Sequence, residues 1–204
     1  MTTTLQPTLG GVRKAAPADS AAVGSALAAA FYDDPVFGWI TPDDARRAAV
    51  VPRAFDLFVE VLAPHDDIWT TTSGVTGAAC WVPYGRQAIP EDQAEDVMGR
   101  LAEISGPDAG RMLEVVALLD EHHPHEPHEY LWFVGVVPAA QGRGIGAALM
   151  APVLERADRA GVPAYLEATS PRNKALYERH GFVAREAIAV AGAPPIWPMW
   201  REPA

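Results

Sequence analysis

The residues best suited to chemistry lie in a glycine-rich segment, 141–146, which reads Gln-Gly-Arg-Gly-Ile-Gly. An apolar run, 130–137, precedes it, and an alanine- and leucine-rich stretch follows to Ala160. This order predicts a strand, a tight loop and a helix that begins inside the loop. Glycines allow a ligand to approach the backbone closely. The first N–H groups of a helix have no internal partner and lie at the positive end of its dipole. The segment therefore predicts a site for an anionic group such as pyrophosphate.

Two common phosphate loops do not fit this segment. The dinucleotide fingerprint needs a third glycine, and Leu149 stands at the matching position after Gly144 and Gly146. The Walker loop needs a Gly-Lys pair followed by serine or threonine, and the segment contains no lysine.

The segment resembles instead the coenzyme loop of the GNAT acetyltransferase superfamily, Q/R-x-x-G-x-G/A. Gln141, Gly144 and Gly146 fill its fixed positions, and Asn173, Tyr177 and Gly181-Phe182 fit the same superfamily further along the chain. The resemblance implies an α/β fold with a mixed, largely antiparallel sheet, whose fourth and fifth strands splay apart between flanking helices. It also implies acetyl-coenzyme A as the acetyl donor, with no metal. The coenzyme-binding residues would be Val136, Val137, Gln141, Gly142, Arg143, Gly144, Ile145, Gly146, Ala147, Asn173 and Tyr177.

Within the superfamily the chain is most similar to the puromycin N-acetyltransferases. The similarity includes Pro171-Arg172-Asn173 and Tyr177-Glu178-Arg179, and it is dense only after about Pro124. It implies transfer of an acetyl group to the primary amine of a small molecule, such as an aminoacyl-nucleoside antibiotic, and hence antibiotic resistance. Two alternatives stay open: acetylation of a protein or peptide amine, and a non-catalytic module that binds acyl-coenzyme A.

Three side chains are candidates for proton transfer. Tyr177 is the expected acid, because a phenol is protonated at neutral pH and can donate to a thiolate of comparable basicity. In many members of the superfamily a glutamate on the fourth strand acts as the general base. In this chain Tyr130 stands nearest to that position. The candidates for the base are therefore Tyr130 and Glu167, and an acceptor amine of low basicity would need neither.

The segment 32–39 combines acids and aromatic rings, and it follows the first predicted helix. Tyr32, Asp33, Asp34 and Trp39 are expected to contact the acceptor through carboxylates and cation–π contacts. The competing interpretation is that Asp33 and Asp34 end one helix while Phe37 and Trp39 fill the core.

Composition excludes several classes of partner. The chain has 204 residues and a formal charge of −10, which argues against nucleic acid and favours a cationic small substrate. The single cysteine, Cys80, cannot form an internal disulfide, and together with the absence of a signal sequence or a long apolar run this predicts a cytoplasmic protein without membrane attachment. A monomer and a homodimer are equally compatible with the sequence. The segment 122–128 holds four histidines, and its two prolines favour a solvated loop over a metal site.

The elements that position these residues form one predicted domain, 11–204, after a flexible N-terminus, 1–10. Its acceptor-side half is 11–125 and its coenzyme-binding half is 126–204. We expect a strand at 12–16, a helix to Phe31 capped by Asp19, and a helix from 41–44 to Leu62. A hairpin at 68–82, two helices at 91–104 and 111–122, a strand at 164–168 and a helix to His180 should follow. The last expected elements are an antiparallel pair at 182–190 and 196–201.

Overall fold

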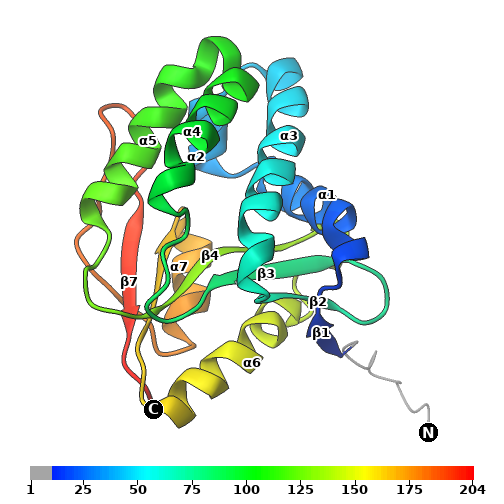
Figure 1. Cartoon of the computed structure of the whole chain (residues 1–204), viewed down its shortest axis with the longest axis vertical. Coiled ribbons are helices and arrows are strands. Elements are labelled where there is room, and N and C mark those ends of the chain that lie inside the picture. The colour runs from blue at the N-terminus through cyan, green and yellow to red at the C-terminus, as the bar shows by residue number, and fades with distance from the viewer. Residues whose placement is uncertain (1–10) are drawn as a thin grey trace, which may run out of the picture.

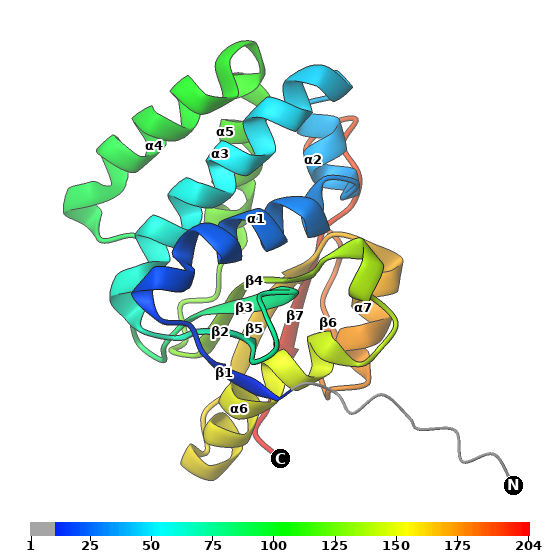
Figure 2. The same cartoon turned by 90° about the vertical axis from the view of Figure 1, so that its right-hand side faces the viewer.

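The computed structural model describes residues 11–204, and the prediction for residues 1–10 lies outside this part of the chain. A seven-stranded sheet, ordered β1-β2-β3-β4-β5-β7-β6, forms the centre. Helices α1 to α5 lie on one face of the sheet and helices α6 and α7 on the other (Figure 2). All strand pairs are antiparallel except β4 with β5, which confirms the predicted mixed and largely antiparallel sheet.

The strands agree closely with the expected positions (Figure 1). They are β1 (Val12–Lys14), β2 (Ile68–Thr71), β3 (Gly77–Val82), β4 (Glu129–Val136), β5 (Ala164–Ala168), β6 (Val183–Ala184) and β7 (Trp197–Arg201). The closing pair is shorter than predicted, because β6 holds only two residues and an isolated bridge joins Ile188 to Ile196 beyond it.

Most helices begin and end at residues that the sequence marks. They are α1 (Ser20–Phe31), α2 (Pro35–Ile40), α3 (Asp44–Leu62), α4 (Glu91–Ser105), α5 (Ala109–His122), α6 (Ile145–Ala160) and α7 (Pro171–Glu178). Short 3-10 turns lie at Pro17–Asp19, Ala63–His65, Gly106–Asp108 and Pro138–Ala140. Asp43 caps α3 and Ser170 caps α7 through their side chains. Asp19 precedes α1 as predicted, but its carboxylate binds Arg13 and the Ala16 N–H rather than the helix.

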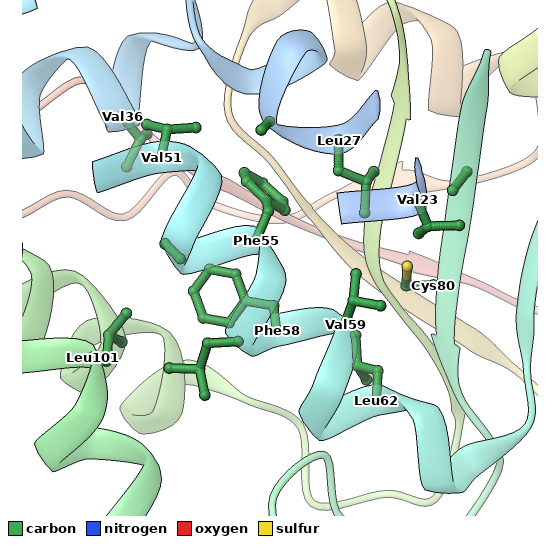
Figure 3. Packing of buried hydrophobic residues seen from close by; sticks show 14 of the residues in the cluster. Val23, Leu27, Val36, Val51, Phe55, Phe58, Val59, Leu62, Cys80 and Leu101 are labelled. Carbon is green, nitrogen blue, oxygen red and sulfur yellow. The ribbon is translucent and has the colours of Figure 1, made fainter. Parts of the chain in front are cut away.

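Alternate residues of the sheet feed two hydrophobic clusters. Ala78, Cys80 and Val82 of β3 face the layer of α1, α3, α4 and α5, while Ala79 and Trp81 face α6. Figure 3 shows the first cluster, in which Phe55, Phe58 and Leu62 of α3 lie against α1 and the sheet. The sheet is therefore buried on both faces and supplies a rigid base for the loops at its edges.

Strands β4 and β5 pair only over 129–131 and 164–166 and then separate. The register of β4 against β3 shifts between Cys80 and Trp81, so that Trp132 is the extra residue on β4. A bulge bends the strand that carries it. Trp132 follows the last residue that is paired with β5, and this bulge therefore directs β4 away from β5. Among the described residues, no helix is both long enough and apolar enough to span a lipid bilayer.

Candidate active site

The glycine loop turns from β4 into α6 through two residues in the left-handed region. Gly142 and Gly144 both have φ of +76°, a conformation that a side chain would strain. The first hydrogen bond of the helix runs from Ala148 N–H to Gly144 C=O at 3.1 Å. The N–H groups of Ile145, Gly146 and Ala147 precede it and have no acceptor within the helix. They form the donor set that the sequence predicts for an anion.

A cavity of about 670 Å³ opens over these donors. Its walls include the loop, the start of α6, residues 134–136 of β4, and Asn173 and Tyr177 of α7. Two guanidinium groups, Arg172 and Arg179, also line it, although the chain as a whole carries a formal charge of −10. The cavity thus offers backbone donors and two arginines to a phosphorylated ligand, while Asp33 and Asp34 also line it. Neither arginine was predicted as a ligand contact. In the sequence, only their position on either side of Asn173 indicated that they could lie near the ligand.

The end of β4 presents one backbone donor to this cavity. The Val137 N–H donates to the Thr76 carbonyl at 2.9 Å and therefore points toward β3. Successive N–H groups of a strand point to opposite sides, so the Val136 N–H points toward the space between β4 and β5. Of the two predicted backbone donors, only Val136 is directed correctly. Gln141 supports this turn, since its side-chain amide donates to the Val136 carbonyl at 3.0 Å.

Tyr177 lies where two cavities meet. It lines the large cavity and also a second one of about 110 Å³ beneath α2 and α5. Its side chain is buried, and its ring packs edge-to-face against Phe182. Burial raises the pKa of the Tyr177 hydroxyl, and the nearby Asp34 carboxylate raises it further. The phenol therefore stays protonated well above neutral pH, as a proton donor requires.

The other two candidates for proton transfer bind each other. The Tyr130 hydroxyl donates to Oε2 of Glu167 at 2.9 Å. The pKa of Tyr130 is raised, first by burial and then by the Glu167 charge, so this phenol is unsuited to act as a base. Oε1 of Glu167 is buried and has no hydrogen-bond partner among the described residues. The Nδ1 atom of His123 lies 3.8 Å from this oxygen.

The histidine segment is only partly the solvated loop that we expected. His122 and His125 are exposed, but His128 is buried and His123 is half-buried. The His123 ring packs edge-to-face against Tyr130 and Tyr165, which places it over the sheet beside Glu167. In the sequence, only the aromatic residues at 130–133 and 164–168 indicated that a histidine ring could pack there. Residues 11–204 contain no group of three or more His, Cys, Asp or Glu side chains arranged to hold a metal ion.

Asp34, one of the four predicted acceptor contacts, forms hydrogen bonds within the protein. Asp34 is the N-cap of α2, with Oδ1 accepting from the N–H groups of Val36 at 2.9 Å and Phe37 at 3.3 Å. Its other oxygen accepts from the Thr169 hydroxyl. Burial is the main cause of the raised pKa of this carboxyl. Asp33 and Asp34 line the large cavity rather than the small one.

Two aromatic residues of the same segment stack on arginines. The Arg47 guanidinium lies over the Tyr32 ring and the Arg111 guanidinium over the Trp39 ring, at 4.8 and 5.3 Å from the ring centroids. Both rings therefore pack against side chains of this chain itself. The competing interpretation, in which the acids end one helix and Phe37 and Trp39 fill the core, describes the packing of Trp39 better. Asp34, however, caps the start of α2 rather than the end of α1.

The sequence model of the acetyltransferase (GNAT) family matches residues 69–182, more than half of the chain. The chain belongs to this family. Its sequence is also 30% identical to that of a Corynebacterium glutamicum protein, whose crystal structure is described as histone acetyltransferase HPA2 and related acetyltransferase. That alignment covers 97% of this chain and 98% of the other, with a TM-score of 0.74.

Two further comparisons place this GNAT protein more broadly. Arylalkylamine N-acetyltransferase 2 of Aedes aegypti shares the fold, with a TM-score of 0.63 at 12% identity over 95% of this chain and 98% of that one. An uncharacterised N-acetyltransferase of Schizosaccharomyces pombe is 39% identical over 59 residues, which cover 29% of this chain and 24% of the yeast protein. The protein is thus an N-acetyltransferase of a family that takes acetyl groups from acetyl-coenzyme A.

The residues present fit that donor. The cradle of the loop is open, since a Cβ atom built on Gly142 would meet no atom within 4 Å and one on Gly146 would meet only Leu176, at 3.7 Å. A pyrophosphate can approach these positions, and the separation of β4 from β5 leaves room beside Val136 for an extended arm.

Proposed function

We propose that this GNAT protein transfers the acetyl group of acetyl-coenzyme A to the primary amine of a small molecule. One observation carries the proposal: the large cavity over the glycine loop and the small cavity beneath α5 share Phe31, Val134, Asn173 and Tyr177 in their walls. A donor held at the loop and an amine held in the small cavity would therefore meet beside Tyr177. Holding two reactants in this way can lower a barrier by about 7–11 kcal/mol.

The donor side would be held by backbone groups. The N–H groups of Ile145, Gly146 and Ala147 face the pyrophosphate, with Arg172 and Arg179 at the cavity wall. Acetyl-coenzyme A supplies a thioester, which is activated toward attack by an amine. The Val136 N–H is directed at the space between β4 and β5, where it can stabilise the negative charge that develops on the carbonyl oxygen.

The protons would be handled by Tyr177 and Glu167. Glu167 accepts a proton from the amine at Oε1, and Tyr177 donates one from its hydroxyl to the departing sulfur. Tyr130 then positions Glu167 through the 2.9 Å hydrogen bond and is not itself the base. Asn173 lines both cavities and Gln141 fixes the turn, so each would act by shaping the site.

For the acceptor, the enclosed small cavity favours a small molecule over a peptide laid across an open groove. An aminoacyl nucleoside such as puromycin is our first candidate, because its free amine stands beside an aromatic side chain. The test is release of free thiol from acetyl-coenzyme A by the purified protein with puromycin, simple amines and a lysine peptide. Thiol release with the small amines supports the proposal. Turnover restricted to the peptide, or none with any amine despite coenzyme binding, would overturn it.

A further inference from the structure

The small cavity has an unusual wall, in which one ionisable carboxylate is surrounded by apolar groups. Aromatic and aliphatic side chains make up most of the lining, among them Phe37, Phe58, Val115, Leu119, Tyr130 and Trp132. Among residues 11–204, Glu167 is the only Asp or Glu side chain that lines it, and no Lys, Arg or His side chain does so. Among the described lining residues, Glu167 is therefore the one carboxylate that a bound amine could meet.

Glu167 has one geometric hydrogen bond within the protein, and the Tyr165 hydroxyl also lies near enough to feel its charge. The Glu167 side chain is 6% exposed, Oε2 accepts from Tyr130, and Oε1 is buried without a hydrogen-bond partner among the described residues. A buried carboxylate oxygen without a partner is costly in an apolar environment. His123 lies 3.8 Å away, beyond hydrogen-bond distance. A cationic group of a ligand would complete the coordination of Oε1.

We infer that the acceptor is a primary monoamine whose single ammonium binds Glu167 Oε1 and whose aromatic or bulky aliphatic side chain fills the apolar cavity. This inference rests on the proposed function and names its substrate class. A second ammonium, as in a diamine or polyamine, would be buried without a counter-charge. A free carboxylate beside the amine, as in an amino acid, would lie against Glu167, and none of the described residues that line the cavity is a Lys, Arg or His that could offset the repulsion.

The volume of the cavity agrees with this class. The volume is about 110 Å³, and one water needs about 10–15 Å³ by the same measure, so the space holds roughly seven to eleven water-sized groups. A phenyl ring with a short amine-bearing chain is of that size. A larger acceptor would insert only its aromatic arm, with the remainder in the larger cavity. Aminoacyl amides and esters thus belong to the class, while the corresponding free amino acids do not.

The experiment compares four acceptors that differ in charge: phenethylamine, phenylalaninamide, phenylalanine and putrescine. We expect kcat/KM for the first two to exceed that for the last two by at least about tenfold. In Glu167→Gln the repulsion is removed, so the ratio between phenylalaninamide and phenylalanine should shrink by about tenfold. Because the same pair is compared in both proteins, the different basicities of the two amines cancel. Glu121→Gln, an exposed residue of α5, is the control for loss of one charge and should keep the wild-type ratio.

The outcomes separate the two proposals. The substrate class is overturned, with acetyl transfer intact, if putrescine or phenylalanine has the same kcat/KM as phenethylamine. It is also overturned if the kcat/KM ratio between phenylalaninamide and phenylalanine is unchanged in Glu167→Gln. If no amine is turned over, calorimetric titration of the same four amines into the coenzyme-loaded protein gives the test. Binding of phenethylamine but not of putrescine then supports the class even though the proposed function has failed, and equal or absent binding overturns it.

Discussion

The Tyr130 hydroxyl and the Glu167 carboxylate are joined by a 2.9 Å hydrogen bond at the place where β4 and β5 begin to separate. Tyr130 lies in the part of β4 that pairs with β5, whereas Glu167 follows the last residue of β5 that pairs with β4. The paired strands therefore fix the phenol, and the phenol fixes one oxygen of the carboxylate. The other oxygen is buried and has no hydrogen-bond partner among residues 11–204, and Glu167 is one of the residues that line the small cavity.

Replacing Tyr130 by Phe keeps the ring and removes this hydrogen bond. Glu167 then loses its positioning, and its buried Oε2 loses a partner, a change that typically costs about 1–3 kcal/mol. We expect Tyr130→Phe to lower kcat/KM for the amine by about tenfold and to leave the Kd of the coenzyme unchanged. Steady-state kinetics and calorimetry measure the two quantities. Complete loss of activity in Tyr130→Phe, with Glu167→Gln retaining it, would identify Tyr130 rather than Glu167 as the base.

Tyr177→Phe tests the proton donor. The hydroxyl should matter only when charge develops on the sulfur, so kcat and kcat/KM should fall together by at least about tenfold, with little change in Tm. Burial raises the pKa of Tyr177 above its ordinary value of about 10, and loss of its proton therefore should not limit wild-type activity below about pH 10. Turnover of the variant at the wild-type rate across the pH range would show that the sulfur departs without this residue.

Gly146 gives the cleanest test of the coenzyme cradle. An alanine there would place its Cβ 3.7 Å from Leu176, an ordinary contact, while a glutamate would bring bulk and negative charge to the helix N-terminus. We expect Gly146→Ala to bind acetyl-coenzyme A normally and Gly146→Glu to lose binding, both with a wild-type far-UV spectrum. Gly144 is less suitable, because any side chain is strained at its φ of +76°. Equal affinity of the two Gly146 variants by calorimetry would refute the pyrophosphate assignment.

Asp34 should act on stability more than on the acceptor. Asn can cap α2 and still face Thr169, so Asp34→Asn should alter the free energy of unfolding by less than about 1 kcal/mol, whereas Asp34→Ala should lower it by about 1–2 kcal/mol. Because the folded-state pKa of Asp34 is raised, the stability contributed by its proton is present below about pH 4 and is lost as pH rises. Relative to Asp34→Asn, the wild type should therefore be more stable at pH 4 than at pH 7 in urea titrations. A selective rise of acceptor KM in Asp34→Asn would instead restore the predicted contact with substrate.

Arg156 holds together a buried acidic pair. Its guanidinium binds Asp67 at 2.5 Å and Glu129 at 3.0 Å, and both carboxylates are almost fully buried. Arg156→Met would leave them facing each other, and we expect the free energy of unfolding to fall by about 3 kcal/mol or more. Arg159→Met, an exposed position on the same helix, is the matched control and should change it by less than about 0.5 kcal/mol. Similar denaturation midpoints for the two variants would show that solvent, rather than Arg156, stabilises the carboxylates.

The parts that the sequence predicted well are those in which neighbouring residues carry the whole signal. The glycine loop before α6 and the start of α3 within residues 41–44 each depend on residues that are close together in the sequence. Asp34 also had a local signal, since an acid before Pro35 is typical of an N-cap, but the acids and rings around it suggested a ligand contact instead.

The small cavity was beyond local reasoning. It assembles side chains from α2, α3, α5, β4 and β5, and the placement of His123 beside Glu167 depends on how the segment after α5 returns to the sheet. Likewise, Val136 and Val137 are equivalent in sequence, and only the strand register decides which N–H is bonded to Thr76 and which is available. Contacts between distant segments are fixed by packing, which no local pattern encodes.

Cys80 has a practical consequence for all of these measurements. The thiol is fully buried in the cluster between the sheet and α3, and burial raises its pKa to about 12 (Figure 3). The folded protein therefore offers no reactive thiolate, and a colorimetric thiol reagent will register only the coenzyme sulfur set free by turnover. When the chain unfolds, its one cysteine becomes accessible. The same reagent, without coenzyme, then counts unfolded molecules one for one, so a single assay chemistry reports both catalysis and the integrity of every variant.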